Sequence, residues 1–307
     1  MPPNQNDRLP RSNGQHKNGF ESEHSVSALE TAFGYPKDFL GNRFVYIVVS
    51  PRAGGLSIGV NMNPDKDCNF DCLYCEVDRQ EPGAEPRLDV KVMADELKAT
   101  LRTVRGGGMP LLPRYRHLPA ELLRLQHVAL SGDGEPTLAS AFAEAVEAVV
   151  HVRAISGIPF VKIVLITNAT GLDLPQVQKG IKLLTRADEV WAKLDGGTQD
   201  YLDRIDRPKV PLSKVLHNIL TLGRQRPLVI QSLFPAIGGL EPSEEEIAQY
   251  TQRLKDLKAG GAQISLVQIY SATRPMSRGG CGHLPLKSLS RIAQAVRDVS
   301  GLRAEVF

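Results

Sequence analysis

Three of the four cysteines of this 307-residue sequence lie close together, in the stretch CNFDCLYCEVDR. Cys68, Cys72 and Cys75 have the spacing Cys-x3-Cys-x2-Cys, and Tyr74 directly precedes the last of them. Cysteine thiolates are ligands for zinc and for iron–sulfur clusters. Three thiolates leave one position of a four-ligand centre open, so this stretch predicts a metal centre whose last ligand comes from elsewhere.

Three other interpretations of the cysteines have to be weighed. Structural zinc usually takes two pairs of ligands, and the only further combination in the sequence is Cys281 with His283, far along the chain. A redox pair formed by Cys72 and Cys75 leaves Cys68 without a role. Packing as small apolar side chains is disfavoured by the polar and charged residues around the cysteines, which are Asp65, Lys66, Asp67, Asn69 and Asp71.

Further polar residues directly follow short apolar runs that are rich in valine and isoleucine. They form the segment GDGEPT at 132–137, the pair Thr167 and Asn168, and the pair Lys193 and Asp195. The loops at the carboxyl ends of parallel strands emerge at one common rim of a sheet. The cysteines and these polar residues are therefore expected to lie together on that rim.

The elements that position these residues alternate between strands and helices. Helices over Leu138–Val152 and Glu244–Lys258 place apolar residues on one face each. Strictly alternating units of this kind predict an α/β fold with a parallel sheet, either open and doubly wound or curled into a barrel. The predicted strands are Ser57–Met62, His127–Ser131, Val161–Thr167, Glu189–Asp195, Leu228–Phe234 and Gln263–Tyr270, with Trp191 in the core.

Composition agrees with a globular enzyme, at 42% hydrophobic and 23% charged residues. The formal net charge of +3 is too small to indicate a nucleic-acid partner by itself. No apolar run is long enough to span a membrane, and the few cysteines favour a reducing, cytoplasmic setting. We expect residues 1–40 to form a disordered or loosely packed tail and residues 41–307 to form one domain.

The segment Leu101–Leu125 differs from an ordinary connection because it is long and contains several arginines with three glycines and three prolines. We expect a solvated insertion on the surface of the domain. The alternative is a lid or a contact to an anionic substrate.

The cysteine stretch, placed after the first of six strands, resembles the radical S-adenosylmethionine enzymes. The resemblance implies a partial (β/α)6 or full βα barrel of parallel strands. It also implies a [4Fe-4S] cluster on Cys68, Cys72 and Cys75, with S-adenosylmethionine on the fourth iron. Reductive cleavage of that cofactor would give a 5′-deoxyadenosyl radical that starts chemistry on a substrate. An electron donor such as flavodoxin or ferredoxin is then the expected partner.

The same resemblance implies cofactor contacts at the other strand ends. Gly132, Asp133, Gly134 and Glu135 resemble the family's Gly-Gly-Glu segment, which binds the methionyl ammonium group. Taken alone, this loop would be a simple helix entry with Pro136 in its first turn. The polar groups of Thr167, Asn168, Lys193 and Asp195 suit the ribose and carboxylate, or could cap strands, and Tyr74 is expected beside the adenine.

Five segments narrow the resemblance to the wyosine-type branch, whose best-known members modify guanosine in tRNA. They are SGDGEPTL at 131–138, ITNAT at 166–170, KLD at 193–195, RIDRP at 204–208 and ATRP at 272–275. The tRNA-modifying members have additional N-terminal cysteines for a second cluster, whereas no cysteine precedes Cys68 here. Modification of tRNA is therefore the second hypothesis. A glycyl-radical activase and a non-catalytic iron–sulfur or zinc protein are the others.

Four residues that are not expected to contact the cofactor are candidates for substrate chemistry. Cys281 could donate a hydrogen atom to a substrate radical, although a single loop cysteine is usually inert. Arg204 and Arg207 could bind a substrate carboxylate or phosphate, but pairing with Asp203 and Asp206 is the preferred interpretation. Arg274 presents the same choice.

Overall fold

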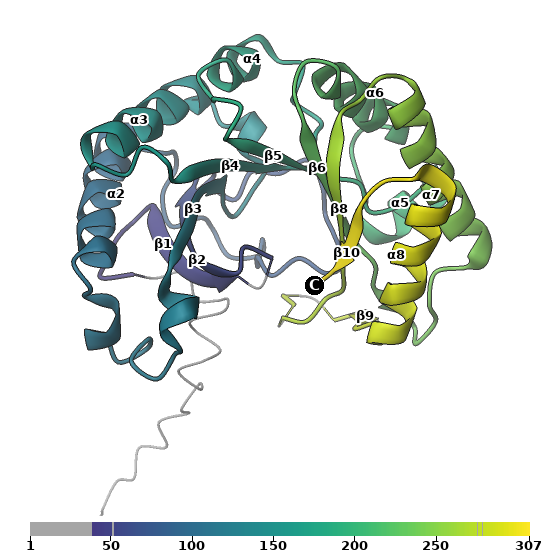
Figure 1. Ribbon diagram of the computed structural model, residues 1–307, viewed down its shortest axis with the longest axis horizontal. Coiled ribbons are helices and arrows are strands. Elements are labelled where there is room, and N and C mark those ends of the chain that lie inside the picture. The colour runs from purple at the N-terminus through teal and green to yellow at the C-terminus, as the bar shows by residue number, and fades with distance from the viewer. Residues whose placement is uncertain (1–38, 51, 275, 278) are drawn as a thin grey trace, which may run out of the picture.

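A computed structural model describes residues 39–50, 52–274, 276–277 and 279–307. Eight strands form one strongly curved sheet whose outer face is covered by helices (Figure 1). The strand order is β1-β2-β3-β4-β5-β6-β8-β10. The strands are β1 (Val45–Ser50), β2 (Gly55–Asn61), β3 (Leu125–Ser131), β4 (Lys162–Thr167), β5 (Glu189–Lys193), β6 (Leu228–Leu233), β8 (Ile264–Tyr270) and β10 (Ala304–Val306).

All six predicted strands are present, and they run parallel to one another. The sequence prediction missed β10, which is parallel to β8, and β1, which pairs antiparallel with β2. In the described part of the chain the edge strands β1 and β10 do not pair with each other. The sheet is therefore a partial barrel, and the full-barrel option is wrong.

The helices of the outer layer begin and end at residues with ordinary capping chemistry. Asp89, Thr198 and Ser243 accept hydrogen bonds from backbone N–H groups at the starts of α2, α5 and α7. The last helix ends at Gly301, whose φ of 61° is left-handed. The helices are α2 (Val90–Arg105), α3 (Phe142–Ile155), α4 (Pro175–Ile181), α5 (Gln199–Ile205), α6 (Leu212–Gly223), α7 (Glu244–Ala259) and α8 (Leu286–Ser300).

The apolar residues of the sheet divide between its two faces. One large core fills the space between the sheet and the helices, and the apolar face predicted for α3 lies in it. A second, small cluster of Val164, Trp191 and Val229 fills part of the concave inner side, so Trp191 is a core residue as predicted. The ring of His127 packs edge-on against Trp191, with 5.3 Å between ring centroids. Above this cluster the inner side is lined by polar residues.

The arginine-rich segment lies at the amino end of the parallel strands. Its first residues, to Arg105, form the last turn of α2, and its end at Leu125 is the first residue of β3. Tyr115 anchors it, because this side chain is buried and its hydroxyl donates to the carbonyl of Ile47 at 3.3 Å. The segment is therefore on the opposite end of the sheet from the strand-end loops, and the lid alternative does not hold.

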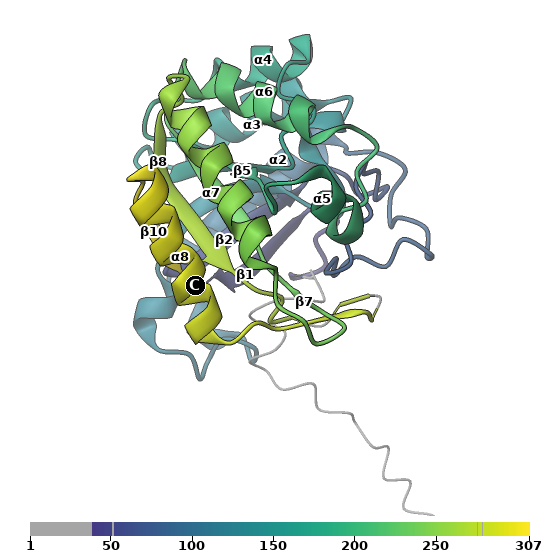
Figure 2. The same ribbon diagram turned by 90° about the vertical axis from the view of Figure 1, so that its right-hand side faces the viewer.

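A short two-stranded ribbon, β7 (Ala236–Ile237) with β9 (Cys281–Gly282), projects beside the sheet (Figure 2). The predicted N-terminal tail lies outside the described residues up to position 38, while Phe39 is buried in the core. None of the helices in the described part is both long enough and apolar enough to cross a membrane.

Candidate functional site

The cysteine loop, residues 62–89 between β2 and α2, brings its three thiols to one cavity. Cys68, Cys72 and Cys75 are partly buried, are not in disulfides, and line a cavity of about 190 Å³. The neighbouring strand ends complete the wall. They contribute Gly132, Asp133, Gly134, Glu135, Thr167, Asn168 and Lys193, so the structure brings together most of the predicted site residues.

The cysteine loop is fixed from one side by the segment that follows α5. The N–H of Asp71 donates to the carbonyl of Asp206 at 2.9 Å, and that of Leu73 donates to Ile205 at 2.7 Å. In return the N–H of Lys209 donates to the carbonyl of Asn69 at 3.0 Å. The motif RIDRP therefore acts on the cysteine loop through its backbone.

The loop with the sequence GDGE fixes the cysteine loop from the other side. The N–H of Glu135 donates to the carbonyl of Asp67 at 3.0 Å. A Cβ atom at Gly134 would lie 1.8 Å from that carbonyl oxygen, so only glycine fits here. Gly132 has a φ of 142°, and a Cβ atom there would lie 2.3 Å from Oδ1 of Asn61. The glycines thus allow this loop to touch the end of β2 and the cysteine loop, whereas the sequence prediction had attributed the close approach to a bound cofactor.

Glu135 is the centre of a buried hydrogen-bond network. Its carboxylate accepts from the N–H and hydroxyl of Thr137, from the hydroxyl of Thr167, and from the N–H of Asn168 at 2.7 Å. The side-chain amide of Asn168 in turn donates to Asn69 at 2.8 Å. Burial raises the pKa of Glu135 despite these donors. The network ties the ends of β3 and β4 to the cysteine loop.

Tyr74 connects the cysteine loop to two buried carboxylates. Its hydroxyl contacts Asp195, and it lies 2.7 Å from Asp206. Lys193 lies 3.0 Å from Asp195 and 4.9 Å from the centre of the Tyr74 ring. Burial, together with the Asp195 carboxylate, raises the pKa of Asp206 to about 7. The phenolic oxygen of Tyr74 is thus hydrogen-bonded within the protein.

Arg79 provides a positive charge at the thiols. Its guanidinium donates to the sulfur of Cys75 at 3.0 Å and to the carbonyl of Asp133 at 3.2 Å. Its buried Nε has no hydrogen-bond partner in the described part of the chain. Burial would lower the pKa of Arg79, but the cysteine side chains outweigh this effect and raise it. A guanidinium in this position suits an anionic group in the cavity.

The residues that line the cavity have the chemistry that an iron–sulfur cluster needs. Its lining includes three thiols, the guanidinium of Arg79 and two carboxylates, those of Asp133 and Glu135. Within the described ranges no three His, Cys, Asp or Glu side chains form a group that could hold a single metal ion. A cubane cluster bonds each thiolate through a different iron, so separated thiols around one cavity are what it requires. The residues present fit such a cluster.

Burial favours the neutral form of two of the thiols, those of Cys68 and Cys72. It raises the pKa of Cys68 to about 11, and burial followed by the nearby Asp206 carboxylate raises that of Cys72 well above its ordinary value. Metal binding to such thiols must release protons.

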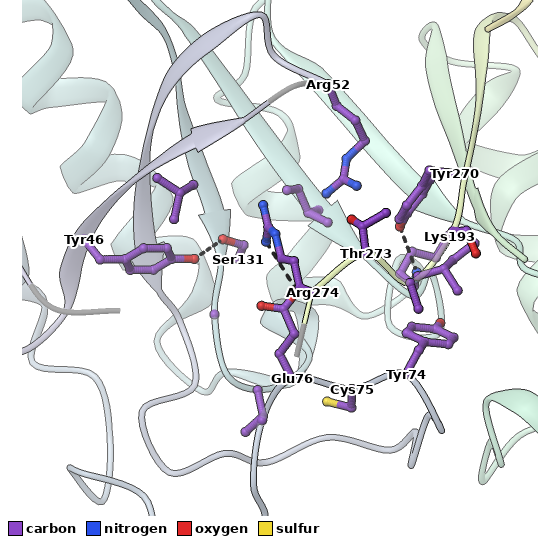
Figure 3. A pocket seen from close by; sticks show the side chains of 17 residues that line it. Tyr46, Arg52, Tyr74, Cys75, Glu76, Ser131, Lys193, Tyr270, Thr273 and Arg274 are labelled. Carbon is purple, nitrogen blue, oxygen red and sulfur yellow. Dashed lines mark hydrogen bonds and ion pairs between the residues drawn. The ribbon is translucent and has the colours of Figure 1, made fainter. Parts of the chain in front are cut away.

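A second pocket, of about 290 Å³, extends from the cysteine loop into the concave inner side of the sheet (Figure 3). Cys75 and Tyr74 lie at one end, and Arg52 enters from the other. Between them Arg274 forms an ion pair with Glu76 at 3.3 Å, and the hydroxyl of Tyr46 lies 2.8 Å from that of Ser131 (Figure 3).

Of the four residues considered for substrate chemistry, only Arg274 lines one of these two pockets. Arg204 and Arg207 are both exposed, and Arg207 pairs with Asp71 at 3.6 Å. The predicted pairing with Asp203 and Asp206 is therefore wrong for Arg207. Cys281 lies in β9, with its sulfur 3.2 Å from that of Met276.

Sequence reasoning missed Arg79 and Arg52 as pocket residues. Arg79 was within reach, because it follows the last cysteine by four residues. Arg52 gave no signal, since its position depends on β1, which was not predicted to be a strand.

The structure is similar to solved structures of radical S-adenosylmethionine proteins. It matches a radical SAM methyltransferase from Sphaerobacter thermophilus with a TM-score of 0.57 and 16% identity, over 86% of this chain and 68% of that one. It matches TYW1 with a lysine–pyruvate adduct bound with a TM-score of 0.54 and 14% identity, over 86% of both chains. The chain therefore has the radical S-adenosylmethionine fold, which the resemblance stated from the sequence had implied.

In sequence the chain is similar to proteins described as UPF0026 proteins. One from Synechocystis is 30% identical over 185 residues, which is 59% of this chain and 60% of that protein. One from Helicobacter pylori is 25% identical over 230 residues, which is 73% of this chain and 66% of that protein. The chain thus spans less than two thirds of these relatives. No family model matches it.

Proposed function

We propose that this chain is a radical S-adenosylmethionine enzyme. In this proposal Cys68, Cys72 and Cys75 bind a [4Fe-4S] cluster, and S-adenosylmethionine occupies the adjoining space. The observation that carries the proposal is that three thiols from one loop line a single cavity together with the ends of β3 and β4. Bound there, the cluster would supply one electron to cleave S-adenosylmethionine reductively and generate a carbon radical.

The residues of the chain then have positioning roles. The backbone of 205–209 and the GDGE loop hold the cysteine loop in place from two sides. Arg79 offsets the negative charge of bound thiolates. Lys193 and the polar strand ends remain the proposed contacts to S-adenosylmethionine. The second pocket, which begins at Cys75, holds the substrate and limits its contact with water.

The proposal implies an external one-electron donor such as flavodoxin or ferredoxin, and a reducing, cytoplasmic setting that keeps the thiols free. Whether the radical leads to oxidation, to group transfer or to rearrangement depends on the substrate. The likeness to a methyltransferase and to TYW1 concerns the fold and does not assign either reaction to this chain.

Anaerobic reconstitution with iron and sulfide tests the proposal. We expect about four iron atoms per chain, a spectral change on adding S-adenosylmethionine, and 5′-deoxyadenosine after reduction. Replacing Cys68, Cys72 or Cys75 by alanine should abolish 5′-deoxyadenosine formation. Cys281→Ala is the matched control and should bind iron like the unaltered protein.

One zinc ion per chain in place of iron would contradict the proposal. So would a cluster that does not respond to S-adenosylmethionine, because this is the behaviour of a structural or electron-transfer protein.

A further inference from the structure

The inner pocket contains three cations, of which two have a carboxylate partner. Lys193 is paired with Asp195, and Arg274 is paired with Glu76. The third cation, Arg52, has no carboxylate or other hydrogen-bond acceptor among the described residues. Its one described contact is with the ring face of Tyr270, 4.2 Å from the ring centre.

Arg52 reaches this place because of the direction of β1. Since β1 is antiparallel to β2, the turn between them lies at the amino end of the parallel strands. From this turn the guanidinium points into the pocket, toward Thr273 and Arg274, while Cys75 lies at the far end (Figure 3). A ligand between them would therefore contact Arg52 and the cysteine loop with opposite ends.

The side chain of Arg52 is partly buried, and a shielded N–H group without an acceptor is unfavourable. Its Nε is shielded from solvent, and burial followed by the nearby charge of Arg274 lowers its pKa, which Tyr270 and Glu76 only partly offset. The cation–π contact recovers only part of the hydration that the group has lost. Guanidinium groups bind carboxylates and phosphates through two parallel hydrogen bonds, which would satisfy the free N–H groups.

We propose that the substrate of this enzyme is a small organic anion whose carboxylate or phosphate group binds Arg52 in the inner pocket. This proposal rests on the function proposed above, to which it adds the chemical class of the substrate. The rest of the substrate then extends toward Cys75, so that its reacting C–H bond lies at the cluster end of the pocket.

Equilibrium dialysis with two radiolabelled probes, inorganic phosphate and succinate, tests the anion site at constant ionic strength. We expect one saturable site per chain for at least one probe, and the probe that binds identifies the acidic group. Arg52→Gln should raise the Kd for this probe at least about tenfold, because the guanidinium is its main partner. Arg52→Lys keeps the charge without the planar fork and should give an intermediate Kd. Arg291→Gln, at an exposed ion pair, is the control and should leave the Kd unchanged.

Three outcomes would overturn the proposal: neither probe binds, Arg52→Gln binds as the unaltered protein does, or Arg52→Gln weakens S-adenosylmethionine binding equally. The last would make Arg52 a cofactor contact. Circular dichroism shows whether Arg52→Gln folds. If it does not, the Kd of Arg52→Lys is compared with that of the unaltered protein, and an unchanged Kd contradicts the proposal. Dialysis needs neither reductant nor turnover, so its failure is distinct from failure to form 5′-deoxyadenosine.

Discussion

The hydroxyl of Tyr74 can donate one hydrogen bond, yet it lies within hydrogen-bond distance of both Asp195 and Asp206. The second contact requires a proton on one of the carboxyl groups, and the raised pKa of Asp206 agrees with this. The side chain that precedes the last cysteine therefore anchors the loop in the protein interior. A sequence motif could locate this tyrosine but could not reveal its two partners.

Tyr74→Phe tests this anchoring. The substitution leaves two buried carboxyl groups without their shared partner, so we expect the free energy of unfolding to fall by about 1–3 kcal/mol. Urea denaturation of the metal-free protein measures this change. Tyr201→Phe is the matched control, because the buried Tyr201 hydroxyl has no hydrogen-bond partner in the described part of the chain. A loss for Tyr201→Phe as large as that for Tyr74→Phe would contradict the interpretation.

Spacing was sufficient to predict that the three cysteines lie together, because they come from one continuous loop. The contacts of Glu135, Asp195 and Arg207 could not be predicted in this way, since each joins segments that are far apart in the sequence. Arg207 illustrates the limit. Asp206 is adjacent in sequence, but its side chain points inward to Tyr74, and the arginine pairs with Asp71 instead.

At the level of elements, the site depends on two loops that touch without side chains between them. Gly134→Ala would place a Cβ atom against the carbonyl of Asp67, and flexible atoms cannot relieve this contact because the neighbour is backbone. We expect a loss of about 1–3 kcal/mol in the free energy of unfolding and weaker iron binding, as the cysteine loop moves away.

Chemical denaturation and iron analysis of the reconstituted variant measure both effects. Gly279→Ala is the control, because no atom of the described residues lies within 4 Å of its added Cβ, and the stability of the protein should change by less than about 0.5 kcal/mol. Normal iron content in Gly134→Ala would show that the close contact does not position the cysteines.

The alternation of valine-rich strands and amphipathic helices was enough to predict the parallel part of the sheet. The two edge strands were missed for different physical reasons. β10 has only three residues, so it shows no period. β1 is almost entirely buried apart from Val48, and a short buried run does not reveal its direction or its neighbour.

For the whole molecule, His127 couples stability to pH. It lies on the inner side of the sheet, 2.8 Å from the hydroxyl of Ser57, and burial lowers its pKa to about 4. The unfolded chain takes up this proton near pH 6.5, so acidification favours the unfolded state. The stability contributed by neutral His127 is complete above pH 6.5 and is lost as the pH falls toward 4.

Urea denaturation at pH 7.5 and pH 5 should show this effect by comparison with His127→Gln. We expect the unaltered protein to lose about 2 kcal/mol more than the variant between the two pH values. Other titrating groups are common to both proteins and cancel in the difference. Equal losses would mean that His127 is protonated in the folded protein as readily as in the unfolded one.

The antiparallel direction of β1 has one more consequence. Arg52 lies at the amino end of the parallel strands, and the three cysteines lie at the carboxyl end. The length of the strands separates them. If Arg52 binds the substrate as proposed, substitutions at Arg52 alter which molecule is accepted without disturbing the loop that would generate the radical. Such a chain could acquire a new specificity in few evolutionary steps, because its two tasks are inherited in separate, interchangeable parts.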